Sequence, residues 1–275
     1  MRRNIFCLLA IVLTVFAACE KKPRVGDAIH FTWQGRSKSF GIEAPNGRKY
    51  IVDYGDASVV IYSGRGDWQG LTYYYTDFSD YTVTIIGNTS ECLFSYFECN
   101  DMNLSRLDVS GCSGLRNLNC YGNQIEILDI RKNTELERLN CADNRLIVLN
   151  LPANSKLRRL ICSYNCLPLS ELYKISKMIS DPSNKLLGYQ RLARQIVKAG
   201  SSIDYSAQKE FGGISTLFVV KKEGRLAIVN DDYTMYEGKI TFNNIGDYEI
   251  IMTNDAIVSD ENSPASVTAE ITVSD

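Results

Sequence analysis

The chain has 275 residues, more than one compact domain usually holds, so we expect two or three units that each bury a core. Its 30 basic and 32 acidic side chains give a net charge of −2, which supplies too little positive field for a nucleic-acid partner. The only histidine is His30, which removes His-based catalytic triads and His-ligated metals, and the sequence has no P-loop. The composition therefore predicts no enzyme, no cofactor and no metal site.

The first segment is residues 1–19, in which two arginines precede a short apolar run that ends in Ala18-Cys19. The run is shorter than the ~20 residues that cross a bilayer, and it fits the hydrophobic part of a secretory signal. Small residues before a cysteine resemble the lipobox of bacterial lipoproteins, in which that cysteine is acylated. The resemblance implies a lipoprotein signal peptide, lipidation of Cys19, a tether over residues 20–24 and an outer-membrane or cell-surface location. The alternative is an ordinary signal peptide cut near Ala18.

Residues 25–88 have the pattern of a β-sandwich, because short apolar runs alternate with turn residues. The expected strands are 29–33, 40–44, 49–52, 59–62, 71–75 and 81–86. Two segments, 52–57 (VDYGDA) and 75–83 (YTDFSDYTV), resemble conserved parts of the PKD-like β-sandwich domain. Asp53 and Asp56 are candidates for calcium, although two carboxylates in a turn more often cap backbone amides.

A repeat of 21 residues organises residues 89–169. The same columns recur along the chain, with Cys99, Cys120, Cys141 and Cys162 in one and Asn123, Asn144 and Asn165 in another. Apolar columns flank them: Phe94, Leu115, Leu136 and Leu157; Phe97, Leu118, Leu139 and Leu160; Leu104, Ile125, Leu146 and Leu167. The first repeat has Met102 in the asparagine column. These columns predict a solenoid of parallel strands, since each coil buries its apolar side chains only by stacking on the next.

The pattern L-x-x-L-x-C-x-x-N-x-L resembles leucine-rich repeats, and the cysteine column resembles the cysteine ladder of internalin-like surface proteins. We expect each asparagine to satisfy backbone groups where the chain turns inward. Neighbouring coils lie ~4.8 Å apart with parallel side chains, so we expect the ladder cysteines to be free, buried thiols and not disulfides or zinc ligands. The sequence that follows Cys19 has an odd number of cysteines, because Cys92, Cys112 and Cys166 add to the four members of the ladder.

Residues that flank the buried position in each short strand point outward. The expected ligand-binding face is Tyr96, Glu98, Asn117, Asn119, Tyr121, Arg138, Asn140, Arg159 and Ile161, and Asn100, Ala142 and Ser163 complete its rows. Tyrosine and arginine are enriched at interface hot spots. Arg138 and Arg159 are one repeat apart, which indicates a site for an anionic group. The alternative is a solvated face on a protein that acts as a spacer.

Residues 170–186 predict a capping helix and linker, with Ser170 as N-cap and Asp181-Pro182 as the end of the helix. Residues 187–275 return to strand patterns, at 216–220, 225–229, 239–242, 248–253 and 266–273. The segment 245–250 (IGDYEI) resembles a turn into a strand of immunoglobulin-like sandwiches.

Together the segments resemble Bacteroides-type surface lipoproteins: a mainly β chain with a leucine-rich-repeat solenoid between an N-terminal β-sandwich and an immunoglobulin-like C-terminal sandwich. The resemblance implies a non-enzymatic surface or adhesion protein that recognises a protein partner through the repeat face and meets the membrane only through its anchor. The alternative is a glycan-binding lipoprotein that uses exposed aromatics of the N-terminal region, with Trp68, Tyr73, Tyr74 and Tyr75 as candidates.

Overall fold

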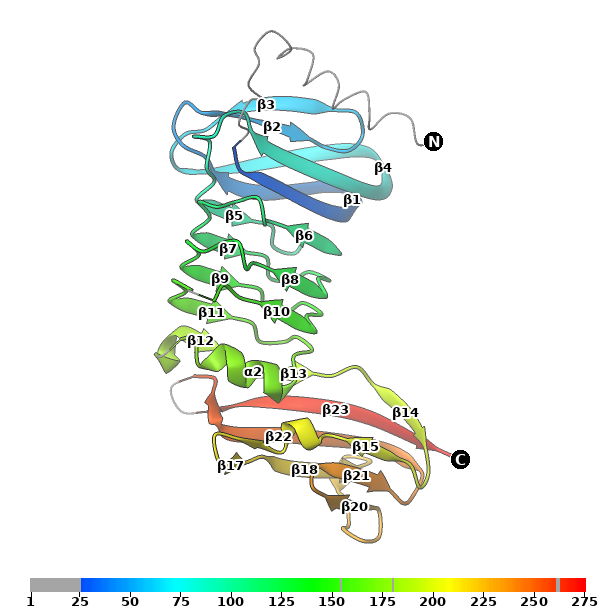
Figure 1. Cartoon of the computed structure of the whole chain (residues 1–275). Coiled ribbons are helices and arrows are strands. Elements are labelled where there is room, and N and C mark those ends of the chain that lie inside the picture. Colours follow the sequence, from blue (N-terminus) through cyan, green and yellow to red (C-terminus); the bar gives the residue numbers. More distant parts are fainter. Residues whose placement is uncertain (1–25, 154, 180, 261–262) are drawn as a thin grey trace, which may run out of the picture.

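The structure is a computed structural model that describes residues 26–153, 155–179, 181–260 and 263–275. The predicted signal peptide (1–19), Cys19 and the tether (20–24) lie outside the described residues. The prediction of a mainly β chain is confirmed, and the strands form an N-terminal sheet, a stack of repeats and three C-terminal sheets along one axis (Figure 1).

The repeats form a stack of coils, each with two short strands except the last, which has one and is followed by α2. On one side β5 (Tyr96–Glu98), β7 (Asn117–Asn119), β9 (Arg138–Asn140) and β11 (Arg159–Ile161) pair in parallel and in register. On the other side β8 (Ile127–Asp129) pairs in parallel with β10 (Val148–Asn150), whereas β6 (Arg106–Asp108) pairs with the N-terminal sheet. The central residue of each strand is buried, and the cysteine and leucine columns form the core between the two sides.

The asparagine column ties each coil to the coil before it. Asn144 accepts a hydrogen bond from the Ile125 amide and donates to the carbonyls of Cys120, Cys141 and Ala142. Asn123 and Asn165 make equivalent bonds. Met102 occupies this column in the first coil. It needs no side-chain amide there, because the N-terminal sheet precedes it and there is no earlier coil to bond. Sequence reasoning missed Gln190, which continues the asparagine column. Its side chain accepts a hydrogen bond from the Leu167 amide and donates one to the Cys162 carbonyl.

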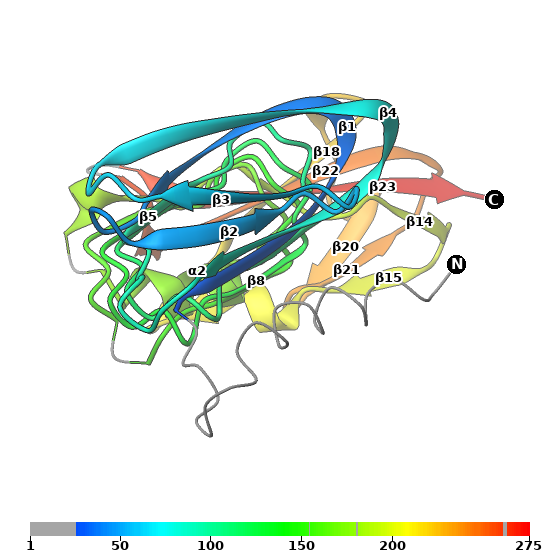
Figure 2. The same ribbon diagram turned by 90° about the horizontal axis from the view of Figure 1, so that it is seen from above.

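The N-terminal strands form one antiparallel sheet that continues into the repeats. Its order is β3 (Val59–Ser63), β2 (Lys49–Asp53), β4 (Trp68–Gly87) and β1 (Ala28–Glu43), and β1 pairs with β6 through its first half and with β5 through its second. The long strands lie across the end of the coils (Figure 2). The pairing of β1 with β4 shifts between Gly35 and Ser37, and Phe31 packs against Phe40 across the fold, with ring centroids 5.6 Å apart.

The prediction of a separate sandwich over 25–88 therefore needs correction. The segments 29–33 and 40–44 belong to one strand, and so do 71–75 and 81–86, because β1 and β4 pair along nearly their whole length. The sequence predicts turns between those segments because the residues there are polar. Asp53 and Asp56 cap the amides of Gly55 and Ser58 in the turn between β2 and β3, at 3.0 and 2.9 Å. The PKD-like assignment stays a prediction.

The helix prediction is wrong at both ends. The helix α2 spans Leu169–Ser176, follows Pro168 and has no side-chain cap. The amide of Ser170 donates instead to Gln208, a residue distant in sequence that replaces the expected local cap. At the other end, the buried ammonium of Lys185 donates to the carbonyls of Ser176 and Ile179. These carbonyls would accept backbone amides in a longer helix, and Lys185 takes the place of those amides. The short 3-10 helix η1 (Pro182–Asn184) and β12 (Lys185–Leu186) follow, and β12 extends the repeat sheet beside β11.

The C-terminal region contains two larger sheets. In the first, β13 (Gln190–Arg191) and β14 (Gln195–Lys198) pair with successive parts of β23 (Pro264–Ser274). The sheet continues from β23 through β22 (Gly246–Val258) and β18 (Leu217–Lys222) to β19 (Arg225–Leu226). The second has β15 (Ser202–Asp204), β21 (Lys239–Phe242) and β20 (Tyr233–Tyr236). The remaining elements are η2 (Ser206–Gln208), β16 (Glu210–Phe211) and β17 (Ile214–Ser215). Phe242 and Tyr248 join the two sheets, with ring centroids 4.9 Å apart. The immunoglobulin-like assignment stays a prediction.

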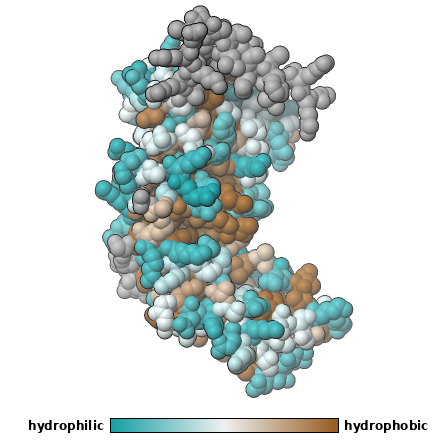
Figure 3. Space-filling view, viewed as in Figure 1, coloured by the Kyte–Doolittle hydropathy of each residue, from teal (hydrophilic) through white to brown (hydrophobic). Residues whose placement is uncertain are grey.

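The predicted strand 225–229 is shorter in the structure: β19 ends at Leu226, and Val229 keeps only an isolated parallel bridge to Tyr233. The side chains of Ile228 and Val229 are exposed. The space-filling view shows that the molecule is hollowed beside β8 and β10, between the N-terminal and C-terminal sheets (Figure 3). Among the described residues, no helix has the length and apolar character needed to cross a membrane.

Candidate ligand-binding groove

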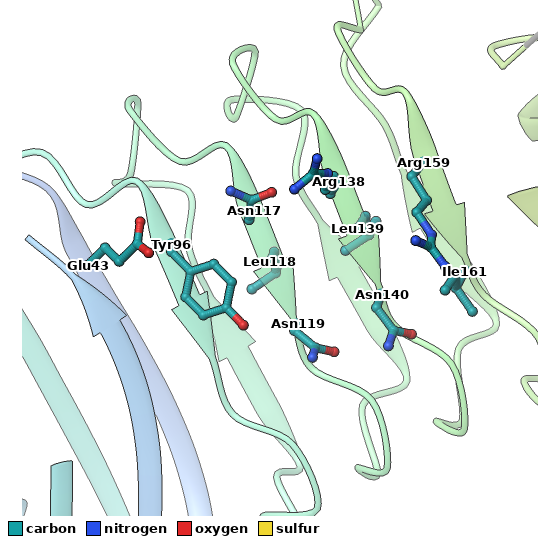
Figure 4. Close-up of a pocket in the computed structure, with 10 residues that line it drawn as sticks. All are labelled: Glu43, Tyr96, Asn117, Leu118, Asn119, Arg138, Leu139, Asn140, Arg159 and Ile161. Carbon is teal, nitrogen blue, oxygen red and sulfur yellow. The ribbon is translucent and has the colours of Figure 1, made fainter. Parts of the chain in front are cut away.

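The outer face of the parallel sheet carries an open groove of about 430 Å³. Its lining comes from β1, β5, β7, β9 and β11, and consists of Glu43, Tyr96, Asn117, Leu118, Asn119, Arg138, Leu139, Asn140, Arg159 and Ile161. Leu118 and Leu139 are the buried central residues of their strands, and the other side chains flank such positions and face outward (Figure 4). The groove is therefore a direct product of strand alternation.

The strand register arranges the outward side chains in two rows. In the first row Glu43, Tyr96, Asn117, Arg138 and Arg159 are successive cross-strand partners. The second row consists of Glu98, Asn119, Asn140 and Ile161, again as cross-strand partners. Figure 4 shows the Tyr96 ring reaching from the first row toward Asn119 in the second.

Acidic and aromatic groups gather at the N-terminal end of the groove. The Tyr96 hydroxyl donates to the Glu98 carboxylate, and the Ser95 hydroxyl donates to Glu43 at 3.1 Å. Burial, followed by the bond to Glu98, raises the pKa of Tyr96 and keeps its hydroxyl protonated. The buried Oδ1 of Asn119 has no hydrogen-bond donor among the described residues, so one acceptor on this face is unsatisfied.

Arg138 and Arg159 form the basic end of the groove. They are direct cross-strand partners, both are exposed, and neither makes an ion pair among the described residues. By contrast, Arg116 lies 3.9 Å from Glu137. Two adjacent guanidinium groups repel each other unless solvent or an anion screens them. The groove is therefore acidic at one end and basic at the other, with three asparagines between the charges.

The structure brings together most of the predicted face. The predicted residues that line the groove are Tyr96, Asn117, Asn119, Arg138, Asn140, Arg159 and Ile161, whereas Glu98 and Tyr121 do not line it. Sequence reasoning missed Glu43, because nothing in its local pattern shows that β1 joins the repeat sheet. Ser163, which strand alternation predicts to face outward, is buried in the structure.

The predicted aromatic cluster of the N-terminal region divides into buried and exposed members. Tyr75 belongs to the core, and Tyr73 stacks on Tyr54 with ring centroids 3.8 Å apart. Trp68 and Tyr74 are 51% and 74% exposed. Only these two of the four candidates present most of an aromatic ring to a ligand.

The seven cysteines of the described residues are free thiols, six of them buried, and Cys166 is half-buried. Burial raises the pKa of both Cys120 and Cys162 to about 12, so these thiols stay protonated and unreactive. No group of three or more His, Cys, Asp or Glu side chains suited to a metal ion occurs in the part of the chain that the structure describes.

The solved structures that resemble the chain include two from Listeria monocytogenes, and both likenesses are of limited extent. The internalin-like protein lmo2027 of Listeria monocytogenes is 21% identical, with a TM-score of 0.40 over 68% of this chain and 59% of that one. The functional domain of InlJ from the same organism, which includes a cysteine ladder, is 17% identical, with a TM-score of 0.33 over 66% of this chain and 48% of that one. The chain thus spans less than two thirds of either structure.

No family model and no curated protein sequence matches the chain. Similarity of this extent assigns no function, so function has to be inferred from the groove itself.

Proposed function

We propose that the chain is an exported, non-enzymatic binding protein, anchored through Cys19, that holds an extended ligand across the repeat sheet. One observation carries the proposal: an open groove crosses five strands, and its outward side chains are aromatic, amide and charged groups without internal ion pairs at its basic end. Solenoids commonly bind ligands on such extended faces. The described residues of the groove include no histidine or cysteine nucleophile.

The ligand carries an anionic group over Arg138 and Arg159. A carboxylate or sulfate there would relieve the repulsion between two guanidinium groups and form charge-assisted hydrogen bonds with both. The groove ends in the opposite charge at Glu43, so a ligand with anions along its whole length would fit less well than one with its charge at the arginine end.

The test uses the double variant Arg138→Ala with Arg159→Ala and a matched control, Arg106→Ala with Arg145→Ala, which removes two exposed arginines outside the groove. The purified proteins are screened against an array of extracellular proteins and glycans. We expect the groove variant to bind at least tenfold more weakly, or by about 1.4 kcal/mol, with a nearly unchanged melting temperature. Full binding by the groove variant would move the site elsewhere and leave the repeats as a spacer.

A protein partner is the first expectation from the sequence, and a glycan is the second. A protein interface needs a desolvated anchor at its centre, usually aromatic or arginine. The centre of this groove holds Asn117, Asn119 and Asn140 instead, and its only outward aliphatic side chain is Ile161. Hydroxyl-rich ligands match such a surface better, which favours the glycan alternative.

The anchor is tested separately with Cys19→Ser. We expect this variant to carry no label from a fatty-acid precursor and to leave the membrane fraction. Membrane association with retained label would contradict lipidation of Cys19 and leave the groove proposal untouched.

A further inference from the structure

We propose that Trp68 extends the groove into a single site for an oligosaccharide that combines neutral and uronic-acid sugars. This inference rests on the proposed function and names its ligand class. It unites the two regions that the sequence presented as alternatives, the repeat face and the exposed aromatics of the N-terminal region.

Trp68 belongs to the same row of side chains as the groove. It is the direct cross-strand partner of Glu43 on β1, and Glu43 is the partner of Tyr96 on β5. Cross-strand partners point to the same face of a sheet. The row therefore runs from Trp68 through the groove to Arg159, over five strand spacings or about 24 Å.

Two glycines hold the indole flat against the sheet. Gly41 and Gly70 are cross-strand partners, and the Trp68 ring lies over both of them. A methyl group on Gly41 would overlap the indole nitrogen, and one on Gly70 would lie 2.8 Å from the six-membered ring. With no side chains beneath it, the ring lies low, and its exposed fraction of 51% presents an aromatic surface to solvent. Sugar rings stack their C–H faces on such a surface.

The polar groups beside Trp68 match sugar hydroxyls. Glu98 is the cross-strand partner of Gly41, so it lies one strand from the indole, where its carboxylate can accept hydrogen bonds from sugar hydroxyls. Asn117, Asn119 and Asn140 each offer a donor and an acceptor, and the acceptor of Asn119 lacks a donor among the described residues. Planar amide and carboxylate groups can pair with neighbouring hydroxyls of one sugar.

The charge distribution sets the order of the sugars. Glu43 and Glu98 repel an anion at the tryptophan end, so a neutral sugar stacks there. The unpaired guanidinium groups of Arg138 and Arg159 take the uronate carboxylate at the far end. A uniformly anionic polyuronate meets repulsion at one end, and a neutral oligosaccharide leaves the arginines unpaired.

The test uses three hexasaccharides: a mixed one with five N-acetylglucosamine residues and one terminal glucuronic acid, a galacturonic acid homopolymer, and an N-acetylglucosamine homopolymer. The chain has two tryptophans, and Trp33 is only 2% exposed, so a change of emission on binding reports Trp68. We expect saturable quenching or a blue shift with the mixed hexasaccharide and weaker binding of both homopolymers.

Variants then show which residues bind the sugar, and calorimetry measures the affinities independently of tryptophan emission. Trp68→Ala and the Arg138→Ala, Arg159→Ala pair should each weaken binding of the mixed hexasaccharide at least tenfold, and Trp68→Phe should recover part of it. The control Tyr74→Ala removes an exposed aromatic of the same strand and should bind normally. Absence of saturable binding, or equal binding by Trp68→Ala, overturns the glycan inference. If a protein from the array binds through the arginines and not through Trp68, the glycan inference fails and the proposed function stands.

Discussion

The hydrogen bonds of the asparagine column (Asn123, Asn144 and Asn165) predict how much stability each replacement by alanine costs. Replacement of Asn144 by Ala removes the acceptor of the Ile125 amide, for which the described residues offer no second partner. The carbonyls that Asn144 serves keep other donors: Cys120 retains Asn123, Cys141 retains Asn165. The dominant cost is one orphaned buried amide, about 1–3 kcal/mol, plus roughly 1 kcal/mol for the weakened carbonyl bonds.

Asn123→Ala should cost more than Asn144→Ala, because the Oδ1 of Asn123 accepts from two amides, those of Met102 and Leu104. We expect a loss of about 2–4 kcal/mol for Asn144→Ala and about 1–2 kcal/mol more for Asn123→Ala. Asn117→Ala, which removes an outward amide of the same repeats, should stay within about 0.5 kcal/mol of wild type.

Urea unfolding followed by circular dichroism measures these differences, provided that the slope of unfolding free energy against urea concentration is the same for all variants. Two results would refute the conclusion that the asparagine column stabilises the fold by accepting backbone amides. One is an Asn144→Ala variant as stable as Asn117→Ala, and the other is an Asn123→Ala variant that loses less free energy of unfolding than Asn144→Ala.

Three further predictions concern buried groups. Asp27 accepts from the amides of Phe94 and Ser113, so Asp27→Asn should lose about 1–3 kcal/mol. Burial raises the pKa of Asp27, so its contribution to stability is full at acidic pH and declines as pH rises through the raised value; the Asn variant should lack that decline in a pH series of melting temperatures. In native protein at pH 8 an alkylating reagent should label Cys166 first and leave Cys120 and Cys162 unlabelled until urea is added, and a bridged pair in mass spectra would refute the free ladder. Cys141→Ser should destabilise the chain by about 1–3 kcal/mol in urea titration, through a poorly paired buried hydroxyl.

The repeat columns could be predicted from the sequence because their cause is local. Each coil needs the same buried positions at the same spacing, so Leu118, Leu139 and Leu160 recur every 21 residues and lie in one stripe. The outward face follows from alternation about those positions. Gln190 escaped notice because α2 shifts it off the 21-residue spacing, although its amide performs the same task as Asn165.

The N-terminal sheet could not be predicted because its causes are not local. Polar residues between Trp33 and Phe40 look like a turn in the sequence, but β4 supplies backbone partners for nearly all of them. Likewise, only the pairing of β1 with β5 places Glu43 and Trp68 beside Tyr96. Helix α2 shows the same limit, since its cap comes from Gln208.

The continuity of the sheet also bears on how tightly the groove can bind. An uncapped solenoid would leave the edge of β5 unpaired, and β1 removes that edge by pairing with it. The same pairing fixes the spacing of Trp68 and Arg159, because neither can move along the row without breaking backbone hydrogen bonds of the intervening strands. A ligand therefore has to order only side chains, at roughly 0.5–1.5 kcal/mol for each, and not the backbone. Weak individual contacts, such as those of sugar hydroxyls, add up to useful affinity only on a surface that is already arranged in this way.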